Sequence, residues 1–293
     1  MQQIERGIIF EDSYLGVTVG GIASSQGTIM IDAPLRPEDT RSWRSALLNQ
    51  RGGSSRLLVH LDAHPDRTLG ARSLDCTIVA QQKTAQVFRN RPTVFKGQNA
   101  QTGAAWEVYS EAVGMRWATP DITFTQKMSL HWGGPEVILE YHPGPTSGTS
   151  WAVLPASKII FVGDTLVIDQ PPFLASADLG AWLESLELLS NSYNDYVIIG
   201  GRGGMASHSA VSVQIQNLKN IVKGIERLVK RNAAPEATEG LIPSLLSDYT
   251  FDEEWKDLYT QRLKHGLFQY YARHYRPASS LEQTGMEEDE QGS

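Results

Sequence analysis

The segment Leu58-Val-His-Leu-Asp-Ala-His-Pro-Asp-Arg-Thr-Leu-Gly70 decides how this sequence is interpreted. Residues 56–60 form an apolar run typical of a buried strand. The loop that follows carries four potential ligands at alternate positions: His60, Asp62, His64 and Asp66. Imidazole and carboxylate groups this close together indicate a metal site or an acid–base site. A polar loop of turn and capping residues is the alternative, and the segment alone favours neither.

The chain around this segment alternates predicted strands with predicted helices. The predicted strands are residues 14–19, 27–32, 56–60, 77–80, 128–132, 137–141, 150–154, 158–162 and 196–199. The predicted helices are residues 38–49, 82–89 and 178–189, followed by apolar stripes at helical spacing over 211–229 and 255–271. This order predicts one domain of α/β class over residues 1–276, with a helical C-terminal extension over about 208–276.

Composition and charge exclude several classes of protein. The chain has 293 residues, is 41% hydrophobic and carries a net charge of −7, which excludes a wholly disordered protein. Residues 277–293 hold five acids and no base, which predicts a disordered acidic tail and leaves −2 for residues 1–276. Such a near-neutral fold has no basic excess for nucleic acid or a membrane surface.

Compartment and membrane attachment are inferred from what the sequence contains. Cys76 is the single cysteine of the chain, so no intramolecular disulfide can form, which favours a reducing compartment. No apolar run approaches the roughly 20 residues that a membrane-spanning helix needs. The first residues carry early acids and lack the apolar centre of a signal peptide. We therefore expect a cytoplasmic protein with no membrane partner.

Five short motifs, in order along the chain, resemble those of the metallo-β-lactamase superfamily over roughly residues 8–230. They are Ile31-Asp32-Ala33-Pro34, Asp62-Ala-His64-Pro-Asp66-Arg67 followed by Gly70, Pro143-Gly-Pro145-Thr-Ser-Gly148, Gly163-Asp164-Thr165 and Gly201-Arg202-Gly203. In the family these segments read Ile-Asp-x-Gly, His-x-His-x-Asp-His, Pro-Gly-His-Thr-x-Gly, Gly-Asp-Thr and Gly-His-Gly. The resemblance implies a four-layer αββα sandwich, here with C-terminal helices.

The same resemblance shows where the sequence departs from the family's metal site. The family holds two metals with five histidines and two aspartates, of which this chain keeps three: His64, Asp66 and Asp164. The other four positions carry Asp62, Arg67, Pro145 and Arg202. Proline has no side-chain donor, and arginine is cationic and cannot ligate. The sequence therefore predicts that the two arginines replace the second metal.

One metal at most is implied by the remaining ligand positions, which are Asp62, His64, Asp66 and Asp164. Three carboxylates and one imidazole suit manganese or iron better than zinc. Between a site with one metal and a site with no cofactor, we expect the site with no cofactor. Three aspartates against two arginines leave one net negative charge in the cleft.

Two function classes stay open. The first is a non-catalytic or ligand-binding protein that keeps the fold without the dinuclear site. The second is a diverged hydrolase of ester, lactone or phosphoester substrates that uses one divalent metal (Mn, Fe or Zn) or none. In a hydrolase Asp66 is the candidate general base, His64 and Asp164 are ligands or proton carriers, and Arg67 and Arg202 bind an anion.

Both classes predict a small-molecule or anionic ligand in the cleft, and the arginines discriminate between a closed and an open site. Arginines fully paired with the aspartates make a closed salt-bridge cluster, whereas arginines that point into a pocket favour an anionic ligand. The C-terminal helices are expected to border the cleft or to form a homodimer contact.

Overall fold

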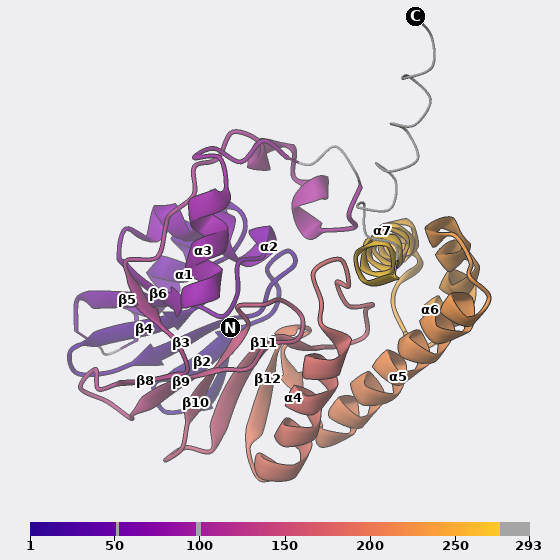
Figure 1. The fold of residues 1–293 in the computed structure, drawn as a ribbon. Coiled ribbons are helices and arrows are strands. Elements are labelled where there is room, and N and C mark those ends of the chain that lie inside the picture. The colour runs from indigo at the N-terminus through magenta and orange to yellow at the C-terminus, as the bar shows by residue number, and fades with distance from the viewer. Residues whose placement is uncertain (51–52, 98–100, 276–293) are drawn as a thin grey trace, which may run out of the picture.

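The fold consists of two β-sheets, seen in a computed structural model that describes residues 1–50, 53–97 and 101–275 (Figure 1). The first sheet contains, in spatial order, β1 (Gln2–Glu5), β2 (Ile8–Glu11), β3 (Val19–Ala23), β4 (Gly27–Ile31), β5 (Ser55–His60), β6 (Thr77–Gln81) and β7 (Ile122–Phe124). The second sheet has the order β13 (Met205–Ala206), β12 (Val197–Arg202), β11 (Ile159–Val167), β10 (Ser150–Leu154), β9 (Val137–Tyr141) and β8 (Lys127–Leu130).

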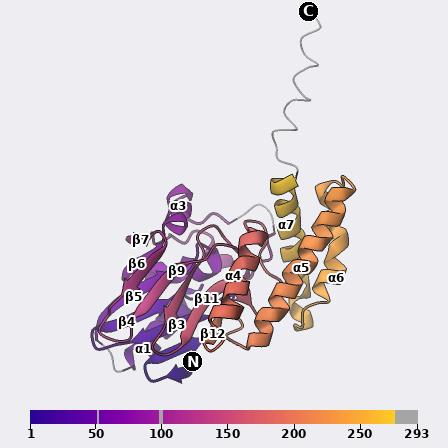
Figure 2. The same ribbon diagram turned by 60° about the horizontal axis from the view of Figure 1, so that its bottom comes forward.

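Helices cover the outer faces of both sheets (Figures 1 and 2). The α-helices are α1 (Pro37–Leu48), α2 (Pro65–Thr68), α3 (Gln82–Asn90), α4 (Leu179–Ser192), α5 (His208–Lys230), α6 (Ile242–Leu246) and α7 (Lys256–Tyr275). Short 3₁₀ turns are η1 (Leu69–Leu74), η2 (Ala105–Val108), η3 (Ser110–Ala112), η4 (Pro235–Leu241) and η5 (Glu253–Trp255). Helices α1 and α3 lie on the side of the first sheet, and α4 and α5 on the side of the second. The predicted four-layer αββα sandwich with C-terminal helices is confirmed.

Successive side chains of each strand point to opposite faces of its sheet, which builds three apolar layers between the four layers of the sandwich. In β4, Ile29 and Ile31 pack between the sheets, whereas Met30 faces the opposite way, toward Trp43 of α1. In the same way β11 sends Phe161 between the sheets, while its neighbouring residues pack against the C-terminal helices. The two-residue period of a strand produces this division, because successive side chains point to opposite faces.

The predicted strand at residues 14–19 is wrong. Only Val19 belongs to a strand, and it begins β3. Gly16 has φ +72°, a left-handed conformation that ends an extended run. Instead of pairing within the first sheet, Thr18 donates its N–H to the carbonyl of Gly201, 2.8 Å away at the end of β12. The segment thus connects the first sheet to the end of β12, where Arg202 lies.

Two pairs of parallel strands position the site. β4 runs parallel to β5, and β11 runs parallel to β12. Polar side chains come at or just past the carboxyl ends of three of these strands: Asp32 after β4, Asp62 after β5 and Arg202 at the end of β12. β11 extends to Val167, beyond its predicted end, and so contains Asp164. Such strand ends are where open α/β sheets place their ligands.

The C-terminal extension is helical, as predicted, through α5, α6 and α7. The prediction for the acidic tail at residues 277–293 lies outside the described residues. Among the residues that the structure describes, no helix has the length and apolar character needed to cross a membrane.

Candidate functional site

The structure brings all six polar residues of the predicted site into one cluster. They come from the loop after β5, from α2, from β11 and from β12, and they are Asp62, His64, Asp66, Arg67, Asp164 and Arg202. Five of them are buried, and the side chain of His64 is 14% exposed. The register inferred from the sequence motifs therefore corresponds to a real spatial arrangement.

Arg67 lies among three carboxylates. Its Nη1 donates to Oδ2 of Asp32 at 2.8 Å, and its Nη2 donates to Oδ1 of Asp164. Its Nε lies 3.3 Å from Oδ1 of Asp62. The guanidinium is fully buried, and each of its three nitrogens lies near an aspartate oxygen. A planar group with five N–H donors suits this arrangement better than a lysine would.

Arg202 joins the remaining carboxylates and the imidazole. Its Nε and Nη2 contact the two oxygens of Asp164 at 3.1 and 3.2 Å, a bidentate pair. Its Nη1 donates to Oδ2 of Asp66 at 2.9 Å. Asp66 also accepts the backbone N–H groups of Ala105 and Trp106, at 3.1 and 2.8 Å. The arginines are thus paired, and the cluster is closed.

Glycine at position 201 permits the close contact between β11 and β12. A Cβ there would lie 2.6 Å from the carboxylate oxygen Oδ1 of Asp164 and 2.4 Å from the carbonyl carbon of Gly163. A side chain at position 201 would push Asp164 away from Arg202, the residue that follows Gly201 in the sequence. The glycine of the Gly201-Arg202-Gly203 motif is therefore required by packing around the ion pairs.

The charge balance differs from the sequence-based count because Asp32 belongs to the cluster. Four aspartates face two arginines, which leaves two net negative charges when all are ionised, where the sequence predicted one. Burial acts to raise the pKa of Asp164, but Arg202 and Arg67 outweigh it and hold this pKa well below its usual range. Burial raises the pKa of Asp62 to about 6, against the lowering effect of Arg67. Of Asp62, Asp66 and Asp164, Asp62 is therefore the carboxyl that takes up a proton most readily.

His64 is a neutral imidazole that accepts hydrogen bonds at Nδ1. Its Nδ1 accepts the N–H of Asp66 at 3.3 Å and lies 3.2 Å from Nη2 of Arg202. A guanidinium can only donate, so this network assigns the lone pair to Nδ1 and the proton to Nε2. Burial lowers the pKa of His64 to about 3, which keeps the ring neutral. The ring packs against Phe173 with centroids 4.4 Å apart.

A cavity of about 300 Å³ lies beside His64. Ala63, Val87, Trp106 and Phe173 supply apolar wall, and hydroxyl groups of threonines and serines add polar positions. Arg91, at the end of α3, also lines it. Since His64 belongs to both, the cavity adjoins the closed cluster.

Helix α7 borders this cavity, in agreement with the expectation for the C-terminal helices. His265 of α7 is part of the lining. One turn earlier, buried Arg262 donates to the carbonyls of Gly103 and Pro171 at 2.9 and 3.0 Å. The Arg262 guanidinium lies 4.1 Å from the ring centroid of Phe173, with that of Arg202 at 4.7 Å. α7 therefore fixes the aromatic ring that packs on His64.

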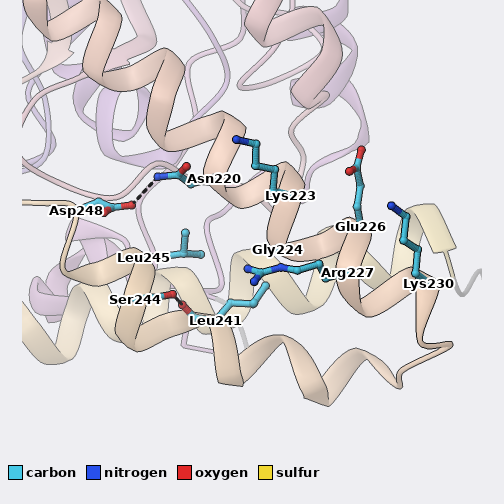
Figure 3. A pocket seen from close by; sticks show the side chains of 10 residues that line it. All are labelled: Asn220, Lys223, Gly224, Glu226, Arg227, Lys230, Leu241, Ser244, Leu245 and Asp248. Atoms are coloured by element: carbon cyan, nitrogen blue, oxygen red, sulfur yellow. Dashed lines mark hydrogen bonds between the residues drawn. The ribbon is translucent and has the colours of Figure 1, made fainter.

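A larger hollow of about 510 Å³ lies between α5 and α6 (Figure 3). Lys223, Glu226 and Lys230 point away from Leu241, whereas the side chain of Arg227 extends toward it. None of the residues that line it has a buried polar atom without a hydrogen-bond partner. It is a surface groove of mixed charge.

Comparison with known proteins agrees with this geometry. Residues 63–202 match the metallo-beta-lactamase superfamily, and the matched region begins beside Asp62 and ends at Arg202. This match covers a little under half of the chain and makes residues 63–202 similar to the metallo-β-lactamase superfamily. No curated protein matches the sequence.

Solved structures of the superfamily share the fold at low sequence identity. The DIM-1 metallo-β-lactamase is 16% identical with a TM-score of 0.56, over 74% of this chain and 95% of that chain. A metallo-β-lactamase from Pontibacter korlensis is 20% identical with a TM-score of 0.54, over 75% of this chain and 98% of that chain. The sec-alkylsulfatase Pisa1 from Pseudomonas sp. is 13% identical with a TM-score of 0.66, over 93% of this chain. The match covers 49% of the sulfatase, so this chain spans about half its length.

The donor atoms of the cluster are engaged by guanidinium groups. Among residues 1–50, 53–97 and 101–275, no three His, Cys, Asp or Glu side chains are arranged to hold an ion. Oxygens of Asp66 and Asp164 accept guanidinium N–H groups, and Nδ1 of His64 faces Arg202. These oxygen and nitrogen lone pairs therefore face N–H groups of the two arginines.

Sequence reasoning missed two residues of the site. Asp32 was recognised as part of a motif but was not counted with the cluster, although it follows a buried strand parallel to β5. That parallel pairing is the signal that could have found it. Arg91 carries no such signal, because only the packing of α3 on the loop after β5 brings it to the cavity. His60, one of the four potential ligands of the opening segment, is buried with Nδ1 3.8 Å from Oδ1 of Asp32.

Proposed function

We propose that this chain is a non-catalytic, ligand-binding member of the metallo-β-lactamase superfamily in which Arg67 and Arg202 replace the metals. The observation that carries the proposal is the closed set of ion pairs between these arginines and Asp32, Asp66 and Asp164. Removing metal ions alone would leave buried carboxylates that repel one another. Two fixed guanidiniums offset that repulsion and keep the loops of the site in place.

Loss of the metals removes the usual source of hydrolytic power. A metal ion supplies a nucleophile by lowering the pKa of its bound water. A guanidinium cannot bind water in this way, because it offers N–H donors and no coordination position. The fold then retains a shaped cavity beside the cluster, and a fold can change its function by changing such a site. A small molecule with an anionic group is the ligand class that we propose.

One feature favours the alternative of a diverged hydrolase for ester, lactone or phosphoester substrates. His64 lines the cavity, and its neutral ring carries the proton on Nε2. Asp66, the expected general base, is fully buried and already accepts three hydrogen bonds. A hydrolytic role would therefore have to use His64 as a donor to the substrate, without help from Asp66.

Metal loading of two proteins tests the proposal. The full chain and the variant D62H/R67H/P145H/R202H are dialysed against zinc, manganese or iron, and bound metal is then measured for each chain. We expect no tightly bound metal and no gain in thermal stability for the natural chain, and uptake of metal by the variant. Two tightly bound ions in the natural chain would overturn the proposal.

An activity assay separates the two candidate functions. The metal-free chain is incubated with a nitrophenyl ester, a lactone and a nitrophenyl phosphate, and product formation is compared with that of the His64→Ala variant. We expect both proteins to give the same background rate. Turnover that depends on His64 would establish the hydrolase instead.

A further inference from the structure

Half-buried Arg91 differs from Arg67 and Arg202 because no aspartate or glutamate among the described residues compensates its charge. It is the C-cap residue of α3, and its guanidinium packs over Trp117 at 4.4 Å and Phe88 at 5.3 Å from the ring centroids. Its Nη1 is buried and has no hydrogen-bond partner, and no carboxylate forms an ion pair with it in the described part of the chain. Arg67 and Arg202, by contrast, are paired with aspartates.

A guanidinium in this position is costly unless a ligand pairs with it. Burying a charge without a partner is unfavourable, and burial lowers the pKa of Arg91 to about 10, which still leaves it cationic at neutral pH. The nearby charge of Asp62 acts in the opposite direction but makes no contact. Two aromatic faces hold the guanidinium where it lines the cavity. The position is therefore prepared for an anion.

The rest of the cavity suits the apolar part of a ligand. Its volume of about 300 Å³ corresponds to about ten water molecules. Val87, Trp106 and Phe173 line it, and Ser147 and Ser176 add hydroxyl groups that make no hydrogen bond to the described residues. A ligand with one charged end and a compact apolar or aromatic body would match these walls.

We propose that the cavity binds an amphipathic organic anion whose oxyanion group pairs with Arg91 while its apolar body packs against Trp106 and Phe173. The inference rests on the proposed ligand-binding function and names its anchor. Arg67 and Arg202 cannot serve as this anchor, because aspartates of the closed cluster already pair with them. A carboxylate, a sulfonate and a phosphate share the chemistry that Arg91 recognises.

Calorimetric titration of the full chain with 4-phenylbutyrate and with its neutral amide tests the anchor. We expect the acid to bind at least about tenfold more tightly than the amide, since a charge-assisted hydrogen bond is lost in the amide. Arg91→Gln should remove this preference. Arg89→Gln, an exposed position on the same helix, should keep it and serves as the matched control.

The head group is resolved with the sulfonate and the phosphate that carry the same phenylpropyl body. Any of the three anions that binds with an Arg91-dependent preference supports the anchor, and the tightest identifies the natural head group. Equal affinity for acid and amide, or an unchanged preference in Arg91→Gln, would overturn the role of Arg91.

A blocking variant distinguishes failure of the anchor from failure of the proposed function. Ala175→Trp fills the cavity from the loop before α4. If this variant loses binding while Arg91→Gln keeps it, the cavity binds ligands and only the anchor is wrong. If the natural chain binds none of the probes, the proposal that the cavity binds an amphipathic anion is overturned. The metal-loading experiment still decides separately whether the arginines of the cluster replace the metals.

Discussion

The closed cluster and the adjoining cavity use arginine in opposite ways. Arg67 is fully buried, and each side of its guanidinium faces an aspartate. Arg91 lies nearby at the cavity, packed between aromatic rings, and has no carboxylate partner. The first arginine stabilises the structure because its charge is compensated, whereas the second keeps its charge available to a ligand. Residue type alone therefore does not tell a structural arginine from a binding one.

The largest expected effect is that of removing Arg67. Arg67→Met leaves Asp32, Asp62 and Asp164 buried without their shared cation, and breaking a buried pair in this way costs about 3–5 kcal/mol. Denaturant unfolding followed by circular dichroism measures the loss. Arg67→Lys keeps the charge and should lose less. A stability equal to that of the natural chain in Arg67→Met would show that the cluster does not hold the fold.

Arg202→Met should have the next largest effect, about 3 kcal/mol, because it leaves Asp66 with its two backbone donors and Asp164 with Arg67. It also removes a positive charge beside His64, so the pKa of this imidazole should rise. The pH dependence of the His64 ring signals in NMR spectra reports this change. An unmoved titration would contradict the contact between Nδ1 and the guanidinium.

Asp62→Asn should stabilise the protein in a pH-dependent way. Because burial raises the pKa of Asp62 to about 6, its ionisation in the folded state reduces stability as pH rises from about 4 to about 6. The variant should therefore be more stable than the natural chain by about 1–3 kcal/mol above pH 6, and equal to it near pH 4. The side-chain oxygen of the asparagine can still accept the hydrogen bond from the backbone N–H of His64.

Unfolding at pH 4 and at pH 7.5 measures this difference, with exposed Asp195→Asn as the control. Asp66 and Asp164 have lowered pKa values, so the stability that they contribute to the protein is lost as pH falls. This loss is the same in the natural chain and in the variant. A variant that is less stable than the natural chain at pH 7.5 would show that the ionised carboxylate of Asp62 is needed by Arg67.

The smallest effect on stability should be that of Arg91→Met, which is expected to leave the unfolding free energy unchanged or slightly higher. The substitution removes a charge without an ion pair and keeps an apolar side chain of similar length against Trp117. Thermal unfolding in the absence of ligand is the measurement. A loss as large as that of Arg67→Met would mean that Arg91 is structural, and the distinction between cluster and cavity would fail.

Much of this architecture could be predicted from the sequence, because it depends on local patterns. Apolar runs gave the strands, and short motifs at their ends placed Asp62, His64, Arg67 and Arg202 near one another. The pairing of Arg67 with Asp32 depends on which strands lie side by side, a property of the sheet and not of either segment. The same holds for Arg91, which only tertiary packing brings to the cavity.

The proton on His64 was also beyond sequence reasoning. It depends on which donors face Nδ1, and one of them comes from Arg202 on a different sheet from β5. The strand predicted at residues 14–19 failed for a related reason. Its β-rich composition suits a strand, but Gly16 has a left-handed conformation and the N–H of Thr18 bonds to the carbonyl of Gly201.

A crystal structure of the full chain grown with zinc, with anomalous data at the zinc edge, tests the central claim most directly. The claim is that guanidinium groups have replaced the metals of the fold. It predicts Arg67 and Arg202 between the aspartates, with no anomalous peak at the cluster. A strong peak coordinated by Asp164 and His64, with Arg202 displaced from both, would contradict it.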